Sequence, residues 1–333
     1  MKAVALTAPG IAEVIQLPEP EPQAGEIMIQ VEFVGLCGSD LNSYRGINPL
    51  VTYPRVIGHE IAATVLHGNA EFSAGTRVTV SPYTSCGRCS SCCRGRPNAC
   101  QFNQTFGVQR DGAITQLLSV PAEKIYASSL SLKELCLVEP LTVGMHAVSR
   151  ARITRDDVVV VYGCGGVGLG AIAGAAFRGA ITIAVDVDDE KLETARACGA
   201  AHLINSDREA VHDRLQMLTA GFGPDVVIEA VGLPQTFRSA VEEVAFTGRV
   251  VYIGYAKEPV SYETRLFVQK ELDIMGARNA LPEDFREVIN LLAAGSFPVD
   301  RVITSVVSLE ETPEALARWA ANPASVTKIM IKI

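Results

Sequence analysis

The sequence predicts a doubly wound, parallel α/β domain inserted into a β-rich domain that is assembled from both ends of the chain. The chain has 333 residues, more than one hydrophobic core usually serves, so two domains are expected. Short apolar runs between glycine and proline turns fill residues 1 to about 145, whereas apolar strands alternate with helical patterns after residue 150. From about residue 272 the pattern returns to short strands.

The β-rich part is indicated by its strands and by the loops between them. Residues 26–34 and 76–80 alternate as half-buried strands do. Residues 17–26, LPEPEPQAGE, form an extended loop because the prolines exclude regular structure. After one helix at 282–294, a strand at 328–333 ends the chain. The expected segments are a β-rich domain at 1–147, an α/β domain at 148–272 and a return segment at 273–333.

The α/β part follows a strand–helix–strand order. Its expected strands are 158–162, 181–186, 226–229 and 250–254, and its first two helices are 166–178 and 190–198. Such alternation implies a parallel sheet with helices on both faces.

Composition excludes several classes of partner. The hydrophobic fraction of 48% and charged fraction of 20% are those of a soluble globular protein. A formal net charge of −8 argues against nucleic acid or an anionic membrane surface as the main partner. No signal peptide is recognised, and the uncharged residues 158–177 are interpreted as a strand, a glycine turn and a helix rather than a membrane span. We therefore expect a cytoplasmic protein.

A glycine-rich motif follows the first α/β strand and opens a helix. Its residues are Gly163, Cys164, Gly165, Gly166, Val167 and Gly168. The first glycine of Gly-x-Gly-x-x-Gly allows a tight turn, the second lets a pyrophosphate approach the backbone, and the third lets the helix pack on the strand. In this context the motif predicts a Rossmann domain. The alternative is a glycine turn in another α/β fold.

The choice of dinucleotide is indicated by the end of the next strand. Asp186 stands where an acidic side chain accepts hydrogen bonds from the adenosine ribose hydroxyls. The residues after it, Val187 to Asp189, supply no arginine for a 2′-phosphate. The sequence therefore favours NAD over NADP.

Four closely spaced cysteines predict a structural metal site. Cys86, Cys89, Cys92 and Cys100 can surround one tetrahedral zinc and leave no position open. Disulfides are the alternative, but such closely spaced pairs would be strained. Cys93 has no assigned role.

A third group of residues is spread along the chain. Cys37 lies in GLCGSD, His59 and Glu60 lie in VIGHE, and Glu139 lies in VEPL. Each alone is more often structural. Together they offer sulfur, nitrogen and oxygen donors that suit a zinc ion with an open position.

These motifs, with the four-cysteine loop and YGCGGVG, occur in the order seen in the zinc-containing medium-chain alcohol dehydrogenases, which the whole chain resembles. The resemblance implies a GroES-like catalytic domain around the Rossmann domain, an active site in the cleft between them, and two zinc ions per chain. Residues 44–60 and 270–280 look most like the polyol and sugar-acid dehydrogenases of sorbitol (L-iditol) and L-galactonate or L-gulonate type.

The resemblance also implies roles for single residues. Cys37 and His59 would bind the catalytic zinc, and either Glu60 or Glu139 would be the third protein ligand. Asp40 would orient His59. Ser39 would pass the alcohol proton outward, but Asn42 stands where a relay histidine is common and cannot titrate. Lys191 would support the adenosine ribose.

The substrate is expected to be a secondary alcohol of a small polyol or sugar acid. A sugar-acid carboxylate needs a cationic partner, and Arg45 or Arg278 is the candidate, with Tyr44 and Asn279 contacting hydroxyls. The alternative is that both arginines form surface ion pairs. The resemblance further implies a homo-oligomer, either a dimer or a tetramer.

Other functions remain open at this point. A short-chain alcohol or threonine dehydrogenase would use the same scaffold. A catalytically silent, zinc-stabilised binding protein is the alternative outside the enzyme class. A zinc-free quinone reductase of the same superfamily conflicts with every cysteine and histidine named above.

Overall fold

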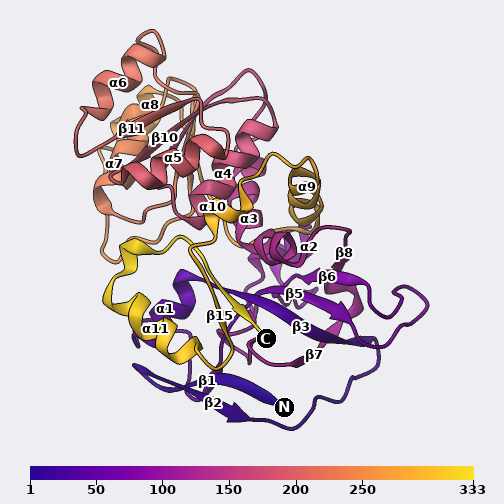
Figure 1. Cartoon of the computed structure of the whole chain (residues 1–333). Helices are drawn as coiled ribbons and strands as arrows, with labels where there is room; N and C mark the ends of the chain where they lie inside the picture. The colour runs from indigo at the N-terminus through magenta and orange to yellow at the C-terminus, as the bar shows by residue number, and fades with distance from the viewer. The chain divides into compact units, whose positions relative to one another are not determined.

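The computed structural model describes residues 1–333, which form two compact units (Figure 1). The β-rich unit comprises Met1–Glu139 and Val299–Ile333. The α/β unit comprises Pro140–Pro298. A 19-residue helix, α3 (Leu132–Arg150), contains the junction between the first part of the β-rich unit and the α/β unit.

The α/β unit contains a six-stranded sheet in which every strand pairing is parallel, in the order β11-β10-β9-β12-β13-β14. The strands are β9 (Val158–Tyr162), β10 (Ile181–Asp186), β11 (His202–Asn205), β12 (Val226–Glu229), β13 (Arg249–Tyr252) and β14 (Asp273–Gly276). The helices are α4 (Gly166–Phe177), α5 (Asp189–Ala197), α6 (Val211–Leu218), α7 (Pro234–Glu243), α8 (Arg265–Gln269) and α9 (Pro282–Ala293). This confirms the predicted doubly wound fold.

The order of these strands positions the glycine motif. β9 has the sequence VVVVY and lies inside the sheet, with β10 on one side and β12 on the other. Its side chains are mostly buried because both faces of a parallel sheet are covered. The strand order reverses at β9, and ligands of such sheets bind at the carboxyl ends of the strands beside this reversal.

The β-rich unit joins both ends of the chain. β16 (Ile329–Lys332) pairs antiparallel with β3 (Glu26–Leu36), so that yellow and indigo segments lie side by side in Figure 1. The larger sheet has the order β15-β16-β3-β5-β6-β8 with β7 also paired to β3, and the smaller one has the order β2-β1-β4. The remaining strands are β1 (Lys2–Ala8), β2 (Ile11–Gln16), β4 (Arg55–Val56), β5 (Glu60–Val65), β6 (Arg77–Val80), β7 (Leu117–Pro121), β8 (Ile125–Ala127) and β15 (Ser305–Ser308).

Short helices complete the β-rich unit. They are α1 (Gly38–Tyr44), α2 (Ser90–Cys93), α10 (Val299–Val302) and α11 (Thr312–Ala321), with single 3-10 turns at Pro97–Ala99, Ala122–Lys124 and Pro323–Ser325. The core of this unit contains Leu6, Ile29, Ile61 and Trp319 among its buried side chains, which unites residues from both ends of the chain.

The two compact units divide the chain elsewhere than the expected boundaries at 147/148 and 272/273. The first junction falls at Glu139/Pro140, inside the continuous helix α3, because a helix carries no turn signal at a domain junction. The second falls at Pro298/Val299, because β14 pairs with β13 and thereby extends the α/β sheet. Residues 273–298 therefore belong to the α/β unit, and helix α11 was not predicted.

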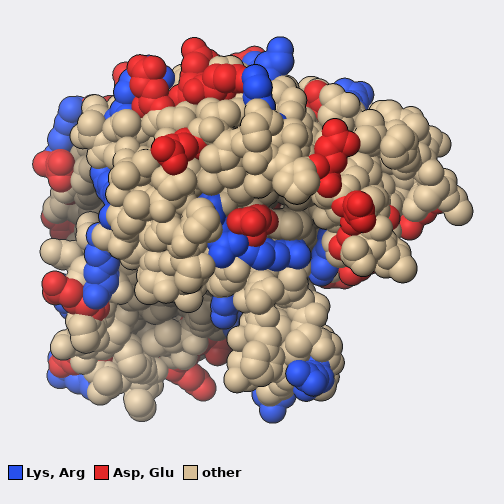
Figure 2. All heavy atoms as spheres, turned by 90° about the horizontal axis from the view of Figure 1, so that it is seen from below, with Lys and Arg blue, Asp and Glu red and all other residues tan.

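The surface mixes both signs of charge. On the face shown in Figure 2, acidic and basic side chains are interspersed among a larger area of other residues. None of the helices combines the length and apolar character that a membrane crossing requires. Residues 158–177 form β9, the glycine turn and α4, as predicted.

Candidate metal centres and cofactor turn

Cys37, His59 and Glu60 come together in the β-rich unit. Cys37 precedes helix α1, and His59 and Glu60 stand at the start of strand β5. One ligand atom from each residue lies within 4.8 Å of the others. His59 and Glu60 are buried, while Cys37 is half-buried. The structure therefore assembles three metal-binding side chains from two separate segments.

Asp40 holds these two segments together. Its fully buried carboxylate accepts a hydrogen bond from the Cys37 amide at 2.9 Å and another from the Gly58 amide at 3.3 Å. The distance from Asp40 Oδ1 to His59 Nδ1 is 3.9 Å, too long for a hydrogen bond. Asp40 thus anchors the backbone beside both metal-binding residues, and its expected role in orienting His59 stays a prediction.

Glu60 has a lysine partner that the sequence did not reveal. The Lys328 ammonium donates to both Glu60 carboxylate oxygens, at 2.5 and 2.6 Å, and to the Leu36 carbonyl at 3.2 Å. Gly35 leaves the room for this carboxylate, because a Cβ at Gly35 would lie 2.0 Å from Glu60 Oε2. The only signal for Lys328 was a lysine directly before the apolar strand at the end of the chain.

Glu139 lies apart from the group of three ligand atoms. It is carried by helix α3, is buried, and accepts a hydrogen bond from the Tyr83 hydroxyl. Burial raises the pKa of Glu139. Both candidate carboxylates therefore already have a protein partner, and Glu60 is the one whose oxygen converges with Cys37 and His59.

The electrostatics of this group suit a cation. Burial lowers the pKa of His59, but Asp40, Cys37 and Glu139 together raise it well above its ordinary value. Burial also raises the pKa of Asp40. Anionic groups crowded around one imidazole are the environment that a divalent metal ion neutralises. The donor set of one sulfur, one nitrogen and carboxylate oxygen fits zinc.

Ser39 offers a hydroxyl beside this group. Ser39 Oγ is buried and has no hydrogen-bond partner, although it follows Cys37 by only two residues. A buried hydroxyl without a partner is costly unless a ligand satisfies it. Asn42, at the position of the relay histidine, is exposed on α1.

The four cysteines Cys86, Cys89, Cys92 and Cys100 also converge, with their sulfur atoms within 4.8 Å of one another. Hydrogen bonding from the Ser91 hydroxyl lowers the pKa of Cys89 to about 5, whereas burial and the neighbouring thiols raise that of Cys92 to about 11. Four thiolates at this separation repel one another, and a bound zinc ion would offset that repulsion. Cys93 is exposed and lies outside this group.

The glycine motif lies between β9 and α4 with each glycine in its predicted role. Gly163 has a φ of 93°, which permits the turn. A Cβ at Gly168 would lie 1.8 Å from the Gly163 carbonyl oxygen, so only glycine lets the helix pack so closely. A Cβ at Gly165 would meet no atom within 4 Å, which leaves the backbone accessible to a pyrophosphate.

Asp186 ends β10 beside this turn. Its carboxylate accepts hydrogen bonds from the Cys164 amide at 2.7 Å and from the Val187 amide at 2.8 Å. Helix α5 begins after Asp188, whose side chain accepts from the Lys191 amide, so Lys191 lies in the first turn of that helix. Both residues expected around the adenosine ribose are therefore positioned by regular structure.

The four proposed substrate residues fall in two places. Tyr44 ends α1, and the Arg45 guanidinium after it donates to the Ala320 carbonyl at 2.5 Å, near the end of α11. Arg278 and Asn279 lie in the loop after β14, in the α/β unit. The Arg45 guanidinium is thus hydrogen-bonded to a backbone carbonyl of the same β-rich unit.

Comparison with known proteins agrees with this geometry. Residues 23–129 match the alcohol dehydrogenase GroES-like domain, and residues 166–294 match the zinc-binding dehydrogenase family. An uncharacterised zinc-type alcohol dehydrogenase-like protein of Haemophilus influenzae is 35% identical, with 99% of this chain and 98% of that protein aligned. The chain belongs to the zinc-containing alcohol dehydrogenases.

Two further relatives of this dehydrogenase bear on its chemistry. The L-galactonate-5-dehydrogenase of Escherichia coli K12 is 32% identical over 94% of this chain and 93% of its own length. A short-chain alcohol dehydrogenase of Escherichia coli CFT073, solved with NADH, is 29% identical with a TM-score of 0.91, covering 100% of this chain and 99% of the other. The dehydrogenase therefore belongs to an enzyme family that uses zinc and a nicotinamide dinucleotide, and the catalytically silent alternative is set aside.

Proposed function

We propose that this dehydrogenase oxidises a secondary alcohol of a sugar acid or polyol, with zinc held by Cys37, His59 and a carboxylate, and with NAD as the oxidant. The observation that carries the proposal is the convergence of Cys37, His59 and Glu60, with the unpartnered Ser39 hydroxyl two residues after Cys37 in the chain. When bound, zinc supplies the positive charge that lowers the pKa of an alcohol, and NAD supplies the hydride acceptor. The protein positions the reacting groups, provides the electrostatic field around them and offers a route for the proton.

Ser39 is proposed to take the alcohol proton. Its Oγ is buried and has no protein partner, so a substrate hydroxyl can satisfy it. Asn42 cannot pass this proton onward, because an amide does not titrate. The proton must therefore leave Ser39 through water or through a ribose hydroxyl of the dinucleotide.

We propose that the Glu60 carboxylate contacts both Lys328 and the zinc ion. In the structure it is paired with Lys328, and it also lies within reach of the two other ligand atoms. Glu139, held by the Tyr83 hydroxyl, is the alternative third ligand. Lys328 and Tyr83 thus each restrain one of the two carboxylates that the sequence left open.

NAD rather than NADP is proposed as the cofactor. Asp186 places a carboxylate at the end of β10, and Asp188 and Asp189 follow it. A 2′-phosphate would meet negative charge and no arginine among these residues. Similar solved structures contain NADH in one case and NADP in another, so the proposal rests on Asp186.

Arg278 is the proposed partner of a sugar-acid carboxylate. Arg278 lies within residues 270–280, which resemble the polyol and sugar-acid dehydrogenases, and the Arg45 guanidinium donates to a backbone carbonyl of the β-rich unit. The name of the L-galactonate-5-dehydrogenase relative supports a carboxylate-bearing substrate. Asn279 beside Arg278, and Tyr44 at the end of α1, remain candidates for hydroxyl contacts.

The test is NADH formation with a panel of L-galactonate, L-gulonate, sorbitol, threonine and simple alcohols. We expect an aldonate to give the highest kcat/KM. Arg278→Met should lower kcat/KM for the aldonate about 10- to 100-fold, the effect of losing one charge-assisted hydrogen bond, and leave sorbitol turnover unchanged. Arg45→Met is the matched control and should alter neither. Equal or better use of sorbitol by the wild type would refute the sugar-acid assignment.

A homo-oligomer is proposed on the basis of the exposed sheet edge. β14 is an edge strand, and Ile274 in it is 39% exposed. Edge strands with exposed apolar side chains are sites of pairing between chains. Light scattering should give the mass of a dimer or tetramer, and the mass of a single chain would contradict the proposal.

A further inference from the structure

The cysteine-rich loop contains a pocket that the dehydrogenase chemistry does not use. Its volume is about 360 Å³, which is within the range of ~300–1,000 Å³ typical of small-molecule sites. The polar side chains that line it are Ser90, Ser91, Arg94, Arg96 and Gln101. No acidic residue is among the lining residues.

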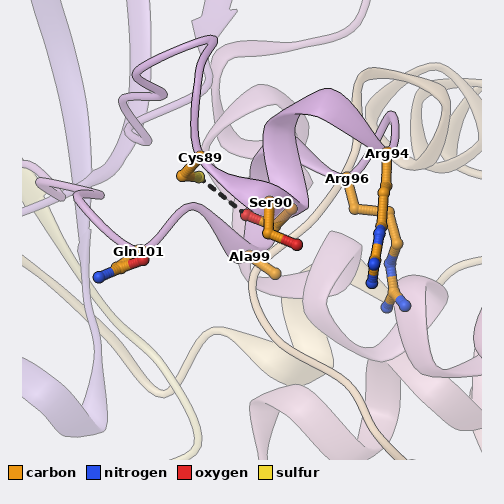
Figure 3. A pocket seen from close by; sticks show the side chains of 7 residues that line it. Cys89, Ser90, Arg94, Arg96, Ala99 and Gln101 are labelled. Atoms are coloured by element: carbon orange, nitrogen blue, oxygen red, sulfur yellow. Dashed lines mark hydrogen bonds between the residues drawn. The ribbon is translucent and has the colours of Figure 1, made fainter.

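Local structure brings the two arginines to the same side of this loop. The Ser91 carbonyl accepts hydrogen bonds from the amides of Arg94, at 3.2 Å, and Arg96, at 2.9 Å. Gly95 between them has a φ of 71°, which reverses the chain. Both arginine side chains line the pocket, and in the view of Figure 3 they extend in the same direction.

The charge around this pocket is unlike that of the rest of the chain. Residues 72–110 contain five arginines and no aspartate or glutamate in 39 residues, although the whole chain has a net charge of −8. Neither Arg94 nor Arg96 forms an ion pair, whereas Arg178 and Arg249 pair with Glu287 and Asp157. Two guanidinium groups that line one pocket repel one another, and an anion bound in the pocket offsets that repulsion.

We propose that this pocket binds an oxyanion of the phosphate type, either free or as the phosphoryl group of a small metabolite. Arg94 and Arg96 hold it through their paired N–H groups, which match the geometry of phosphate oxygens. The Ser90 and Ser91 hydroxyls are available as further donors. The site is independent of the proposed substrate.

A competing explanation is that the arginines only balance the charge of the zinc-bound thiolates. Cys89 lines the pocket, and its Sγ lies 3.1 Å from the Ser91 hydroxyl. In Figure 3, however, Cys89 and Gln101 lie at the opposite end of the pocket from the two guanidinium groups. A charge-balancing role predicts loss of zinc when the arginines are removed, and an anion site predicts loss of phosphate binding.

The experiment is calorimetric titration of the zinc-loaded protein with inorganic phosphate, in the presence of saturating NAD so that the glycine turn is filled. Wild type should bind phosphate saturably, and Arg94→Met/Arg96→Met should weaken binding at least tenfold while retaining two zinc ions. Arg88→Met, an exposed arginine of the same loop outside the pocket, is the matched control and should bind as wild type does. Absence of saturable binding in the wild type, or equal weakening by Arg88→Met, would overturn the proposal.

If the double variant loses zinc, Arg96→Lys decides between the two explanations. It keeps the charge but removes the planar fork of donors. Tenfold weaker phosphate binding at full zinc content supports the site, and unchanged binding overturns it. Titration with a sugar phosphate identifies the source, since tighter binding than inorganic phosphate indicates a metabolite.

Discussion

At the scale of single residues, Glu60 lies between a lysine and the two other candidate metal ligands. Lys328 donates to both of its oxygens, while Cys37 and His59 offer their ligand atoms on the metal-binding side. Burial lowers the pKa of Lys328, but the neighbouring Glu60 and Cys37 raise it overall, so the ammonium stays charged at neutral pH. The charge on Lys328 therefore limits the cost of burying the Glu60 carboxylate.

Lys328→Met is expected to lower the free energy of unfolding by about 3–5 kcal/mol, because it leaves a buried carboxylate without its counter-charge. Urea denaturation of protein stripped of zinc by a chelator measures this loss, because a zinc ion bound beside Glu60 would itself supply a counter-charge. The double variant Glu60→Gln/Lys328→Met removes both charges and should be more stable than Lys328→Met alone. If the double variant is no more stable, the two side chains do not act as a buried pair.

At the scale of elements, two loops contain the parts of the site that could be predicted from the sequence. The glycine turn was predicted because each glycine has a separate steric reason, and the structure shows those reasons at Gly163 and Gly168. The four-cysteine loop was predicted because its spacing suits one tetrahedral metal. Both are local patterns, complete within about 15 residues of sequence.

What the sequence did not reveal depends on contacts between distant segments. Lys328 meets Glu60 because β16 pairs with β3, and β3 in turn pairs with β5. Tyr83 meets Glu139 because a loop after β6 lies against α3. His146 hydrogen-bonds Asp284 of α9 at 2.7 Å and so fastens α3 to α9, although its sequence context indicated only apolar packing. The division at Glu139/Pro140 has a different cause, because α3 runs through it without a turn that the sequence could signal.

The end of β10 is expected to determine the cofactor. Asp186→Ser combined with Val187→Arg removes one negative charge and adds a phosphate partner at an exposed position. The ratio of kcat/KM for NAD to that for NADP should fall by a factor corresponding to about 2–4 kcal/mol. Steady-state kinetics with both cofactors measure it, and Val187→Ala serves as the control. A wild-type preference for NADP would show that the role given to Asp186 is wrong.

Replacing a cysteine of the four-cysteine loop is expected to lower the stability of the protein before it lowers its activity. Cys100→Ser should lower the thermal unfolding temperature and remove one zinc ion per chain, because metal binding there is coupled to folding of the loop. Cys93→Ser, in the same loop but outside the cluster, should change neither. Full zinc content in Cys100→Ser would mean that the four thiols do not hold the structural metal.

At the scale of the whole molecule, the β-rich unit contains the two groups of candidate metal ligands, and the α/β unit contains the glycine turn proposed to bind the dinucleotide. Four cysteines converge in one centre and would fill a tetrahedral zinc, whereas Cys37, His59 and Glu60 converge in the other and as three ligands would leave one position for substrate. The central claim is that the second group holds a zinc ion required for turnover. That claim separates this dehydrogenase from a protein with the same fold and only a structural metal.

The most direct test is the zinc content and NADH-forming activity of Cys37→Ala beside the wild type, with circular dichroism to verify the fold. The wild type should contain two zinc ions per chain and form NADH. Cys37→Ala should contain about one zinc, keep its fold and lose turnover, since a catalytic zinc does not hold the core together. Unchanged turnover in Cys37→Ala, or one zinc ion per chain in an active wild type, would contradict the claim.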